Sequence, residues 1–467
     1  MSDAPLPYTK PNIDWAEIER WDRAYYLHNT QAQAEYVFTG IEGADGNYLY
    51  TATGGKLLDF QSQLVSDNMG HRHPRVHAEI KRAMERFGHV FFGFATDYRA
   101  RAAKLVIDDI LGADSWAGRV RILSSGSEAV ENAMTMARLY ANKPLILTQE
   151  RSYHGLVPGA TQVAGYRGNL STGPETDDNR DVPGFPGSGF VAIPAPEFSD
   201  WQGTGRLPSL DRTEQIIREV GAHKIAGIIT ETMFGGASYM PHHSYLKGLH
   251  DLCRQYGILW ILDDVLCGFG RLGEWFSYQI EPGITPDLMA LGKGINGCAL
   301  PVGAVVASKE IAEFIDRARW WSGSTHDAHP LVCASIVGNL EAMIEDGMID
   351  KARVRGAQLK ERLDALMAKH PCIGRISGRG IYYTIDLVTP NGDPIIAADR
   401  DTLFQGDLSG HPNNIFAAAC GARGLFAGGF MPNTVKAAPP LTITEAEVDF
   451  AVGVMDEAFS AVEKVYH

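Results

Sequence analysis

Apolar residues follow two alternating patterns between about Pro74 and Pro330. Stretches with helical spacing are separated by short continuous apolar runs, which occupy 121–123, 144–147, 225–230, 258–262, 288–291 and 302–306. Apolar runs of this length are typical of strands buried on both faces of a sheet. The alternation predicts an α/β fold, in which a large domain holds a mostly parallel central sheet flanked by helices.

The pattern changes after Pro330. An apolar-periodic helix is predicted from there to Met343, and the elements expected beyond it are a helix over 352–368, a strand over 381–387 and a helix over 445–465. We read these elements as a smaller α+β domain.

The domain boundaries follow from these patterns and from the length of 467 residues, which exceeds what one hydrophobic core usually supports. We expect the large domain over 56–330 and the small domain over 331–467, with residues 1–55 joining the small one. Residues 171–209 are rich in Gly, Pro, Asp and Ser and predict a long surface excursion.

Composition narrows the class of protein. A formal net charge of -14 disfavours binding to nucleic acid and to anionic membranes, which carry the same sign. No stretch is apolar for long enough to cross a bilayer, and the first residues lack a basic segment followed by an apolar one. We therefore expect a cytoplasmic protein that needs neither nucleic acid nor membrane.

No metal site is expected from the spacing of ligand-type residues. The six cysteines have no CxxC spacing and read as reduced, mostly structural thiols. His71, His73 and His77 are close in sequence, but Pro74 starts a helix between them, and only the last two share a helical face. Helix-start and surface roles are expected for these histidines.

A hydroxyl-rich turn follows the first apolar run. Ser125, Gly126 and Ser127 open a helical pattern, so their hydroxyls, backbone N–H groups and the helix dipole are available to a phosphate. The alternative to phosphate binding is helix capping, in which a serine caps the helix and Glu128 is its capping partner. Taken alone, the turn favours the capping interpretation.

Charged side chains also occur at the ends of two other apolar runs. Asp263 and Asp264 end a buried strand, and one carboxylate facing a pyridine nitrogen would keep that ring protonated; a helix cap or a metal ligand is the alternative. Lys293 lies between two glycines just after another run, where an amine can form an imine and act as general base. A surface lysine is the ordinary expectation there.

Two stretches, 268–273 and 292–297, match the dinucleotide pattern G-x-G-x-x-G. Neither is followed by a helical pattern, which the dinucleotide fold requires. A nicotinamide-dependent oxidoreductase is therefore a remote alternative.

Taken together, these segments resemble the class III, fold-type I aminotransferases that use pyridoxal 5′-phosphate (PLP), over nearly the whole chain. The residues that carry the resemblance are Asp263-Asp264-Val265, Gly268 to Gly273, Asp287 to Gly294, Gly70 to Pro74, Tyr153-His154-Gly155 and Thr325 to Pro330. The opening and the region around Ser62 look most similar to members that act on ω-amino acids such as taurine or β-alanine.

The resemblance implies a role for each matching residue. Lys293 is the Schiff-base lysine, and Asp263 is the partner of the pyridine nitrogen. The remaining cofactor-binding positions are Ser125, Gly126 and Ser127 at the phosphate, Tyr153 and Val265 on the two ring faces, His154 and Glu231 nearby, and Thr325 at the phosphate of the neighbouring subunit. A homodimer, or a dimer of dimers, with active sites at the subunit interface is implied.

The expected reaction is ping-pong transamination from an ω-amino acid or amine to pyruvate or 2-oxoglutarate. A decarboxylase, aminomutase or racemase on the same fold is the alternative. One branch of the family has a carboxylate-binding arginine where this chain has Gly429. The substrate candidates here are Lys436, Arg423 and Phe92.

Overall fold

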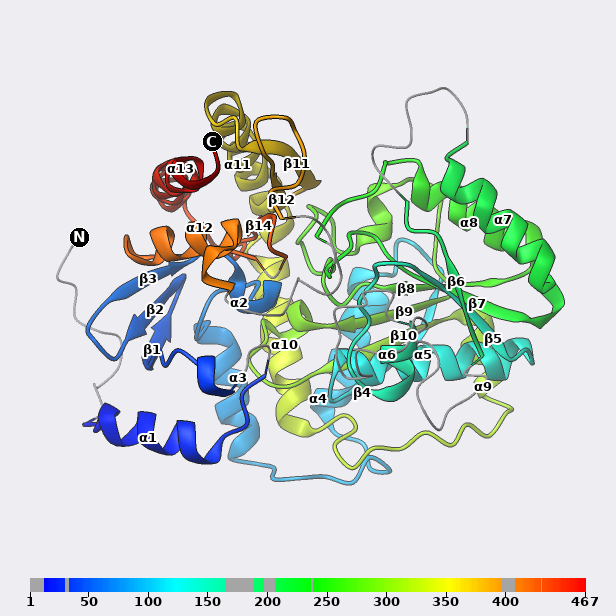
Figure 1. The fold of residues 1–467 in the computed structure, drawn as a ribbon. Coiled ribbons are helices and arrows are strands. Elements are labelled where there is room, and N and C mark those ends of the chain that lie inside the picture. Colours follow the sequence, from blue (N-terminus) through cyan, green and yellow to red (C-terminus); the bar gives the residue numbers. More distant parts are fainter. Residues whose placement is uncertain are drawn as a thin grey trace.

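The computed structural model describes residues 12–29, 33–163, 189–196, 206–236, 238–396, 408–429 and 431–467. Its central feature is a seven-stranded sheet with the order β4-β10-β9-β8-β7-β5-β6 (Figure 1). The strands are β4 (Ala117–Leu123), β10 (Gly303–Ser308), β9 (Leu288–Gly292), β8 (Leu259–Asp263), β7 (Ile225–Glu231), β5 (Leu145–Gln149) and β6 (Phe190–Ile193). Neighbouring strands are parallel except at β10, which is antiparallel to both β4 and β9. The predicted α/β fold with a mostly parallel sheet is confirmed.

Helices cover both faces of this sheet because its strands are apolar on both sides. In β8, Ile261 belongs to a core cluster that includes residues of α5 (Gly126–Ala141), whereas Trp260 and Leu262 belong to one that includes residues of α8 (Tyr245–Tyr256). Figure 1 shows α5 and α6 (Pro158–Val163) on one side, and α7 (Pro208–Val220) and α8 on the other. The continuous apolar runs of the sequence reflect this burial on two faces.

Two smaller sheets lie beside the large one. The first has the order β1-β2-β3-β13, and the second has the order β11-β12-β14. Their strands are β1 (Ile41–Asp45), β2 (Tyr48–Thr51), β3 (Lys56–Asp59), β13 (Leu425–Phe426), β11 (Ile373–Arg379), β12 (Tyr382–Leu387) and β14 (Thr434–Ala437). The parallel pairing of β3 with β13 joins the N-terminal stretch to the C-terminal one.

The remaining helices are α1 (Trp15–Tyr25), α2 (Ser62–Val65), α3 (Pro74–Met84), α4 (Asp97–Lys104), α9 (Lys309–Ile315), α10 (Pro330–Glu345), α11 (Met348–Lys369), α12 (Pro412–Gly421) and α13 (Glu445–Tyr466). A π-helical turn, Leu105–Ile110, follows α4. Helix α10 packs against α3 and α4, and its Asn339 donates to the backbone oxygen of Gly294 at 2.9 Å. This long helix therefore supports the turn that carries Lys293.

Two sequence expectations need correction. The predicted excursion over 171–209 contains strand β6 at 190–193 and the start of α7 at Pro208; the rest of it lies mostly outside the described residues. The surface or helix-start role expected for His71 is also wrong. Its imidazole lies between Asp59 and Asp67, with ring nitrogen to carboxylate oxygen distances of 3.2 and 3.0 Å.

Within the described ranges, no helix is both long and apolar enough to span a membrane. All six cysteines are free, and five of them are buried, as expected for structural thiols.

Candidate active site

Charged side chains converge at one edge of the large sheet, where its parallel strands end. Glu231 ends β7, Asp263 ends β8 and lies opposite Glu231 in the strand register, and Lys293 follows β9 directly. Strands β4 and β5 end at the same edge, because β4 is antiparallel to β10 and β5 is parallel to β7. The carboxyl edge of such a sheet is the usual place for a ligand.

Asp263 is held by a buried histidine. Its Oδ2 lies 2.6 Å from Nδ1 of His154, and its Oδ1 accepts a hydrogen bond from the backbone N–H of Val265 at 3.1 Å. An ionised carboxylate only accepts, so the imidazole donates from Nδ1. The other ring nitrogen, Nε2, is buried and has no hydrogen-bond partner within the described part of the chain.

The adjacent Asp264 lies in a different environment. Its Oδ2 accepts a hydrogen bond from the backbone N–H of Ser277 at 2.9 Å, and burial raises its pKa to about 7. Successive residues at a strand end point to opposite sides, which separates the two carboxylates. Of the two, Asp263 is the one beside His154 at the edge described above.

Lys293 is a partly buried amine in a strained turn. Its φ is 43°, in the left-handed region that non-glycine residues seldom adopt. Burial lowers the pKa of Lys293, and the nearby carboxylates of Asp263 and Glu231 oppose that effect. A lowered pKa makes more of the amine neutral at a given pH, which both imine formation and proton abstraction require.

The hydroxyl-rich turn at the start of α5 lies against the same residues. A Cβ placed on Gly126 would be 2.9 Å from Cγ1 of Val265, and one placed on Gly292 would be 3.1 Å from the same atom. A Cβ on Gly155 would be 2.0 Å from Oγ of Ser127. The turn, Val265, the end of β9 and the 153–155 segment are therefore closely packed, and a side chain at Gly126 or Gly155 would require its neighbours to move.

The capping interpretation of that turn holds as well. Ser125 is the N-cap of α5 and accepts from the N–H of Glu128 at 3.1 Å, while Oε2 of Glu128 accepts from the N–H of Ser124 at 2.9 Å. The Oγ of Ser124 is buried and has no hydrogen-bond partner among the residues the structure describes. The first backbone N–H groups of a helix have no partner within the helix, and the serine cap satisfies only that of Glu128.

Glu231 and Tyr153 are linked through the backbone. Oε2 of Glu231 accepts from the N–H of Tyr153 at 2.7 Å, and its Oε1 accepts from the N–H of Gly235 at 3.0 Å. Burial, together with the neighbouring Asp263 charge, raises the pKa of Glu231 to about 7, although His154 opposes the shift. The phenol of Tyr153 stays partly exposed.

A second lysine, from the small C-terminal sheet, reaches the residues around Glu231 and is buried. Lys436 lies in β14, is only 4% exposed, and donates from Nζ to the backbone oxygen of Gly235 at 2.9 Å. Burial and the neighbouring charge of Lys293 lower its pKa from 10.5 to about 8. The link through Gly235 places Lys436 next to Glu231.

The other substrate candidates lie elsewhere. Arg423, just after α12, forms an ion pair with Glu457 of α13, so its contacts do not support the expectation that it binds substrate. Phe92 is exposed, and a Cβ on Gly323 would lie 3.4 Å from its ring. Thr325 is also exposed, in the turn that precedes α10. Neither Phe92 nor Thr325 has a described contact with Lys293 of its own chain.

Sequence reasoning missed two glycines that shape this edge. A Cβ on Gly303, at the start of β10, would lie 1.9 Å from the backbone oxygen of Ser125. Gly235 supplies both an N–H to Glu231 and an oxygen to Lys436. The only signal for Gly303 was a glycine near the start of the apolar run 302–306, and no pattern indicated Gly235.

The glycine motifs do not form dinucleotide loops. Residues 268–273 form turns, and 292–297 form a strand end and a 3₁₀ turn at Lys293–Asn296, so neither opens an α-helix. In the first motif, Arg271 is buried and donates to the backbone of Ala438 and to Oδ1 of Asn68. This guanidinium joins the turns after β8 to the segment after β14 and to Asn68.

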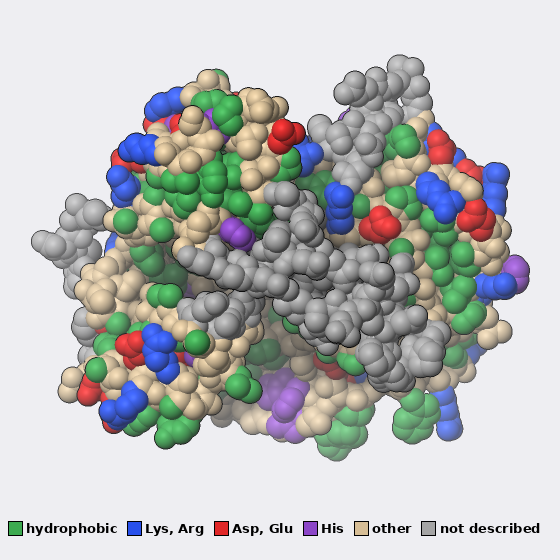
Figure 2. Space-filling model, in the orientation of Figure 1, with side chains coloured by type: hydrophobic (Ala, Val, Ile, Leu, Met, Phe, Trp, Pro, Cys, Tyr) green, Lys and Arg blue, Asp and Glu red, His purple; other side chains and the backbone are tan. Residues whose placement is uncertain are grey.

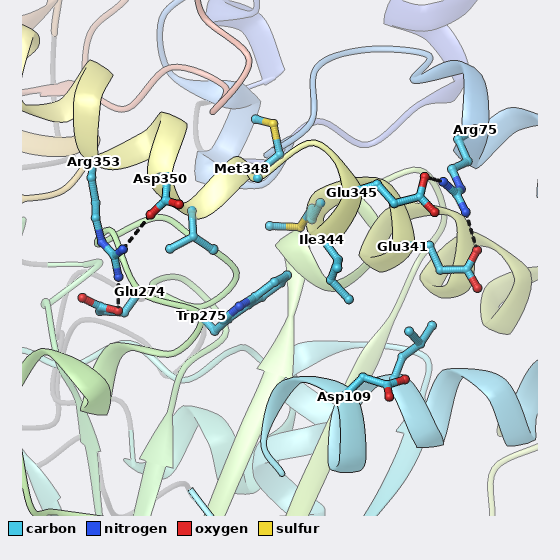
Figure 3. A pocket seen from close by; sticks show the side chains of 14 residues that line it. Arg75, Asp109, Glu274, Trp275, Glu341, Ile344, Glu345, Met348, Asp350 and Arg353 are labelled. Atoms are coloured by element: carbon cyan, nitrogen blue, oxygen red, sulfur yellow. Dashed lines mark hydrogen bonds and ion pairs between the residues drawn. The ribbon is translucent and has the colours of Figure 1, made fainter. Parts of the chain in front are cut away.

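A surface hollow of ≈ 790 Å³ lies apart from these residues (Figure 3). Its rim carries two ion-pair groups, Arg75 with Glu341 and Glu345, and Arg353 with Glu274 and Asp350, on either side of Trp275. None of the sequence-predicted site residues lines it.

The residues at the sheet edge fit PLP, the cofactor expected from the sequence. They provide an amine of lowered pKa, a carboxylate for the ring nitrogen, and a hydroxyl-bearing helix N-terminus for a phosphate. The buried Nε2 of His154 and the buried Oγ of Ser124 are polar atoms that still have hydrogen-bonding capacity.

Comparison with known proteins agrees with this geometry. The family model described as "Aminotransferase class-III" matches residues 30–459. A putrescine–pyruvate aminotransferase of Pseudomonas aeruginosa is 30% identical over 427 residues, which cover 88% of this chain and 88% of that protein.

Two solved structures are also similar. An S-selective transaminase from Arthrobacter sp. has a TM-score of 0.92 and 37% identity, over 97% of this chain and 99% of its own. A taurine:2-oxoglutarate aminotransferase from Bifidobacterium kashiwanohense, in complex with PLP and glutamate, has a TM-score of 0.87 and 26% identity, over 98% of this chain and 100% of its own. Sequence motifs, sheet-edge geometry and these likenesses together establish that the chain belongs to the class III aminotransferases and is a PLP-dependent transaminase.

Proposed function

We propose that this transaminase moves an amino group from an ω-amino acid or an amine to a keto acid, with Lys293 as the residue that binds the cofactor covalently. The observation that carries the assignment is the convergence of Lys293, Asp263 and the Ser125–Ser127 turn at one sheet edge. Bound PLP supplies an aldehyde that carries the amino group and a ring that withdraws electrons from the reacting carbon.

The chain's own residues would then divide the work. Nζ of Lys293 would take a proton from the donor carbon and deliver it to the carbon that keeps the amino group, because burial lowers the pKa of this amine and favours its neutral, basic form. Asp263, fixed by His154, supplies the negative charge that keeps a pyridine nitrogen protonated. The hydroxyls and N–H groups of Ser125, Gly126 and Ser127 hold the phosphate at the start of α5.

The remaining assignments concern the walls of the site. Val265, packed between Gly126 and Gly292, would press on one ring face, and Tyr153 would cover the other. Glu231, which holds the N–H of Tyr153, would fix the position of that tyrosine. Thr325 would reach the phosphate in a neighbouring subunit.

A covalent-labelling experiment tests the lysine assignment sharply, because two buried lysines of lowered pKa lie close together. Borohydride reduction of the holoenzyme should attach the cofactor to the peptide that contains Lys293. The variant Lys293→Ala should lose the label and the activity, whereas Lys436→Met should keep the label. Attachment to Lys436 in the wild-type protein would overturn the proposal.

Lys436 is the candidate for binding the substrate carboxylate or sulfonate. Its ammonium is a compact charge beside Lys293 and Glu231, suited to an acid group at the far end of a short substrate. The relatives that act on taurine and on putrescine suggest an ω-amino donor, and pyruvate or 2-oxoglutarate as acceptor.

Donor specificity can be tested without an acceptor. An ω-amino acid such as β-alanine or taurine should release about one equivalent of its carbonyl product per chain, and the reaction should then stop until a keto acid is added. A panel that includes a simple amine separates acid recognition from amine recognition. Stoichiometric release from α-amino acids alone would contradict the ω-amino proposal.

Variants of Lys436 complete this test. Loss of a charged hydrogen bond costs about 1.5–3 kcal/mol, so Lys436→Met should raise KM for acidic substrates by roughly 10- to 150-fold. Turnover of an uncharged amine donor should change little in its half-reaction. Arg423→Met is the matched control, because Arg423 pairs with Glu457, and its KM should stay at the wild-type value.

A homodimer, or a dimer of dimers, is proposed from the exposed aromatic side chains beside Thr325. Phe91, Phe92, Phe94 and Trp321 are 54%, 41%, 68% and 90% exposed, and such a group commonly marks a protein interface. Light scattering of the holoenzyme should give twice or four times the chain mass. Trp321→Glu should weaken that assembly, and a fully active monomer would refute it.

We further propose a cytoplasmic location and a division into a large PLP-binding domain over 56–330 and a small domain over 331–467, which residues 1–55 join. The sheet β1-β2-β3-β13 supports this link, because β1 and β2 lie within residues 1–55 and are joined through β3 to β13 of the C-terminal part. Limited proteolysis should cut near these boundaries before it cuts within the large sheet.

A further inference from the structure

Arg271 and Lys436 are the two Lys or Arg residues that are buried within the described part of the chain, at 0% and 4% exposure. On the face shown in Figure 2, basic side chains lie on the outside of the molecule, several of them beside Asp or Glu. The hydrogen bonds of the Arg271 side chain to described residues all end on neutral oxygens. Because burying a cation costs free energy, the two buried cations call for an explanation of what they do together.

The guanidinium of Arg271 binds the backbone just after Lys436. One terminal nitrogen, Nη1, donates to the backbone oxygen of Ala438 at 3.3 Å and to that of Pro439. The N–H of Ala438 donates to the oxygen of Phe60 at 3.0 Å, so this residue is held through both of its backbone polar groups. Strand β14 ends one residue before Ala438, and Arg271 therefore fixes the end of the strand that carries Lys436.

The other terminal nitrogen, Nη2, reaches two side chains from the segment after β3. It donates to Oγ of Ser62 at 3.2 Å and to Oδ1 of Asn68 at 2.7 Å. The Oγ of Ser62 in turn donates to the backbone oxygen of Ala438 at 2.7 Å. Guanidinium, hydroxyl and carbonyl thus form a closed ring of hydrogen bonds. A planar guanidinium suits this arrangement, because its donors point in fixed directions and can serve both partners at once.

The turn that presents Ser62 to the guanidinium is strained. The φ angles of Ser62, Gln63 and Val65 are 48°, 60° and 55°, in the left-handed region that non-glycine residues seldom adopt. Such a backbone persists only where the surrounding contacts hold it, and it is found most often at functional sites. Here Asp59 accepts from the N–H of Gln63 at 3.0 Å, and Ser62 accepts from Arg271. The strain indicates a turn that is shaped for a site.

Asn68 extends these contacts to the turn of Lys293. Its Nδ2 donates to the backbone oxygen of Phe269 at 2.7 Å, and a Cβ on Gly294 would lie 2.4 Å from that same nitrogen. Gly294 directly follows Lys293 in the chain. The guanidinium therefore binds the end of the strand of Lys436 on one side and, on the other, an amide that packs against the turn of Lys293.

We propose that Arg271 is a positioning residue for acid substrates, because it holds the end of β14 and thereby the ammonium of Lys436 in place. This inference rests on the proposed role of Lys436 in binding the substrate acid group. Nζ of Lys436 donates to the oxygen of Gly235 at 2.9 Å, and its neighbours include the charges of Lys293 and Glu231. If the strand end moves, the ammonium moves with it, and its attraction for an acid group falls with distance.

The test compares KM with kcat in the holoenzyme. Arg271→Lys keeps a buried cation but loses the planar fork, so it should raise KM for the keto acid, pyruvate or 2-oxoglutarate, by about 3- to 10-fold. The value of kcat at saturating keto acid should stay within about twofold, because loss of uniform binding raises KM alone. An uncharged amine donor should react at the wild-type rate in its half-reaction. Arg138→Lys is the matched control, because Arg138 of α5 also binds a backbone oxygen, that of Pro144 at 2.9 Å, and both constants should stay at wild-type values.

A double mutant separates action through Lys436 from an independent effect. Because Arg271 acts through Lys436, Arg271→Lys should have no further effect on KM for the keto acid in the Lys436→Met protein. A wild-type KM in Arg271→Lys, or effects that multiply in the double mutant, would overturn this inference and leave the role of Lys436 intact. A wild-type KM in Lys436→Met would remove the role of Lys436 itself, and this inference with it.

A milder variant keeps a folding defect from deciding the result. Ser62→Ala removes one member of the hydrogen-bonded ring and leaves the guanidinium in the chain, so KM for the keto acid should rise by about 2- to 5-fold with unchanged kcat. If Arg271→Lys does not fold, Ser62→Ala alone and combined with Lys436→Met gives the same decision. A wild-type KM in Ser62→Ala would then overturn the inference.

Discussion

Nδ1 of His154 lies 2.6 Å from Oδ2 of Asp263, and both side chains are at most 5% exposed. A buried carboxylate that stays charged needs a hydrogen-bond donor, and this imidazole is the side chain that provides one. The pair explains how a carboxylate can remain fixed at the end of β8. His154 acts on any ligand through Asp263 by this bond, and it is a positioning residue.

The first prediction concerns this pair. His154→Ala should lower kcat about 10- to 100-fold, as loss of such supporting contacts usually does, and should weaken retention of PLP. His154→Asn, which keeps a donor, should recover part of both. The absorption spectrum of the bound cofactor as a function of pH is the decisive readout, because a purely structural role would lower the yield without moving the cofactor's apparent pKa.

The main elements of the large sheet could be predicted because their signals are local. Each continuous apolar run between 121 and 306 became a strand, since burial on both faces removes polar residues from it. Strand β6 was missed because it is a single edge strand within a stretch rich in Gly and Pro. The same limit applies to β11, whose alternating side chains include Gly374 and Gly378.

The sheet-edge site was predictable only in part. Residues at strand ends could be expected to meet, since parallel strands end at one edge, and the family resemblance supplied their roles. Contacts between distant segments left no local signal. Lys436 reaches Gly235 in the segment after β7, and Arg271 in the turns after β8 reaches Ala438, so both contacts join residues that are far apart in sequence.

The second prediction uses the lowered pKa of Lys436. Burial and the charge of Lys293 bring this pKa to about 8, so the ammonium loses its proton as pH rises through that value. If Lys436 binds the substrate acid group, KM for 2-oxoglutarate should rise between about pH 7 and pH 9. The arginine variant, Lys436→Arg, stays charged throughout and should give a flatter profile.

A control is needed because burial also raises the pKa of Glu231 to about 7. Both proteins keep Glu231, so the difference between their profiles isolates position 436. An uncharged amine donor should show the same pH dependence in both. Parallel profiles for 2-oxoglutarate would remove Lys436 from substrate binding.

The third prediction concerns stability and His71. Burial disfavours its protonation, but hydrogen bonds to Asp59 and Asp67 outweigh that effect and raise its pKa from 6.5 to about 9. When folding raises the pKa of a group, protonation of that group stabilises the native state. The stabilisation is complete below the pKa of the unfolded chain, and it is lost as pH rises through the pKa of the folded protein. The contribution should therefore be present at pH 6 and largely gone near pH 9.5.

Urea unfolding of His71→Gln beside the wild type measures this contribution. The shift implies a difference on the order of 3 kcal/mol at pH 6, about 1.4 kcal/mol for each pKa unit, and the difference should shrink at pH 9.5. His223→Gln, which is exposed, should show no such trend. A difference that grows with pH would contradict the assignment of the proton to His71.

The last prediction asks whether a carboxylate-binding arginine can be placed at Gly429. A Cβ there would lie 2.2 Å from the backbone oxygen of Thr434, and the oxygen of Gly429 accepts from Asn413 at 2.9 Å. Any side chain must displace backbone that belongs to β14, the strand that carries Lys436. Gly429→Arg should thus destabilise the protein by about 1–3 kcal/mol and raise KM for keto acids instead of lowering it.

Gly429→Ala separates the steric effect from the charge, because a single methyl group already meets the Thr434 oxygen. It should lower the urea midpoint much as Gly429→Arg does. Gly453→Ala is the matched control, since a Cβ on Gly453 in α13 meets nothing within 4 Å, and this change should raise stability by roughly 0.5–1 kcal/mol. A Gly429→Arg protein with a wild-type midpoint and tighter keto-acid binding would show that β14 yields easily. In that case the backbone contact with Thr434 would not be what prevents an arginine at position 429.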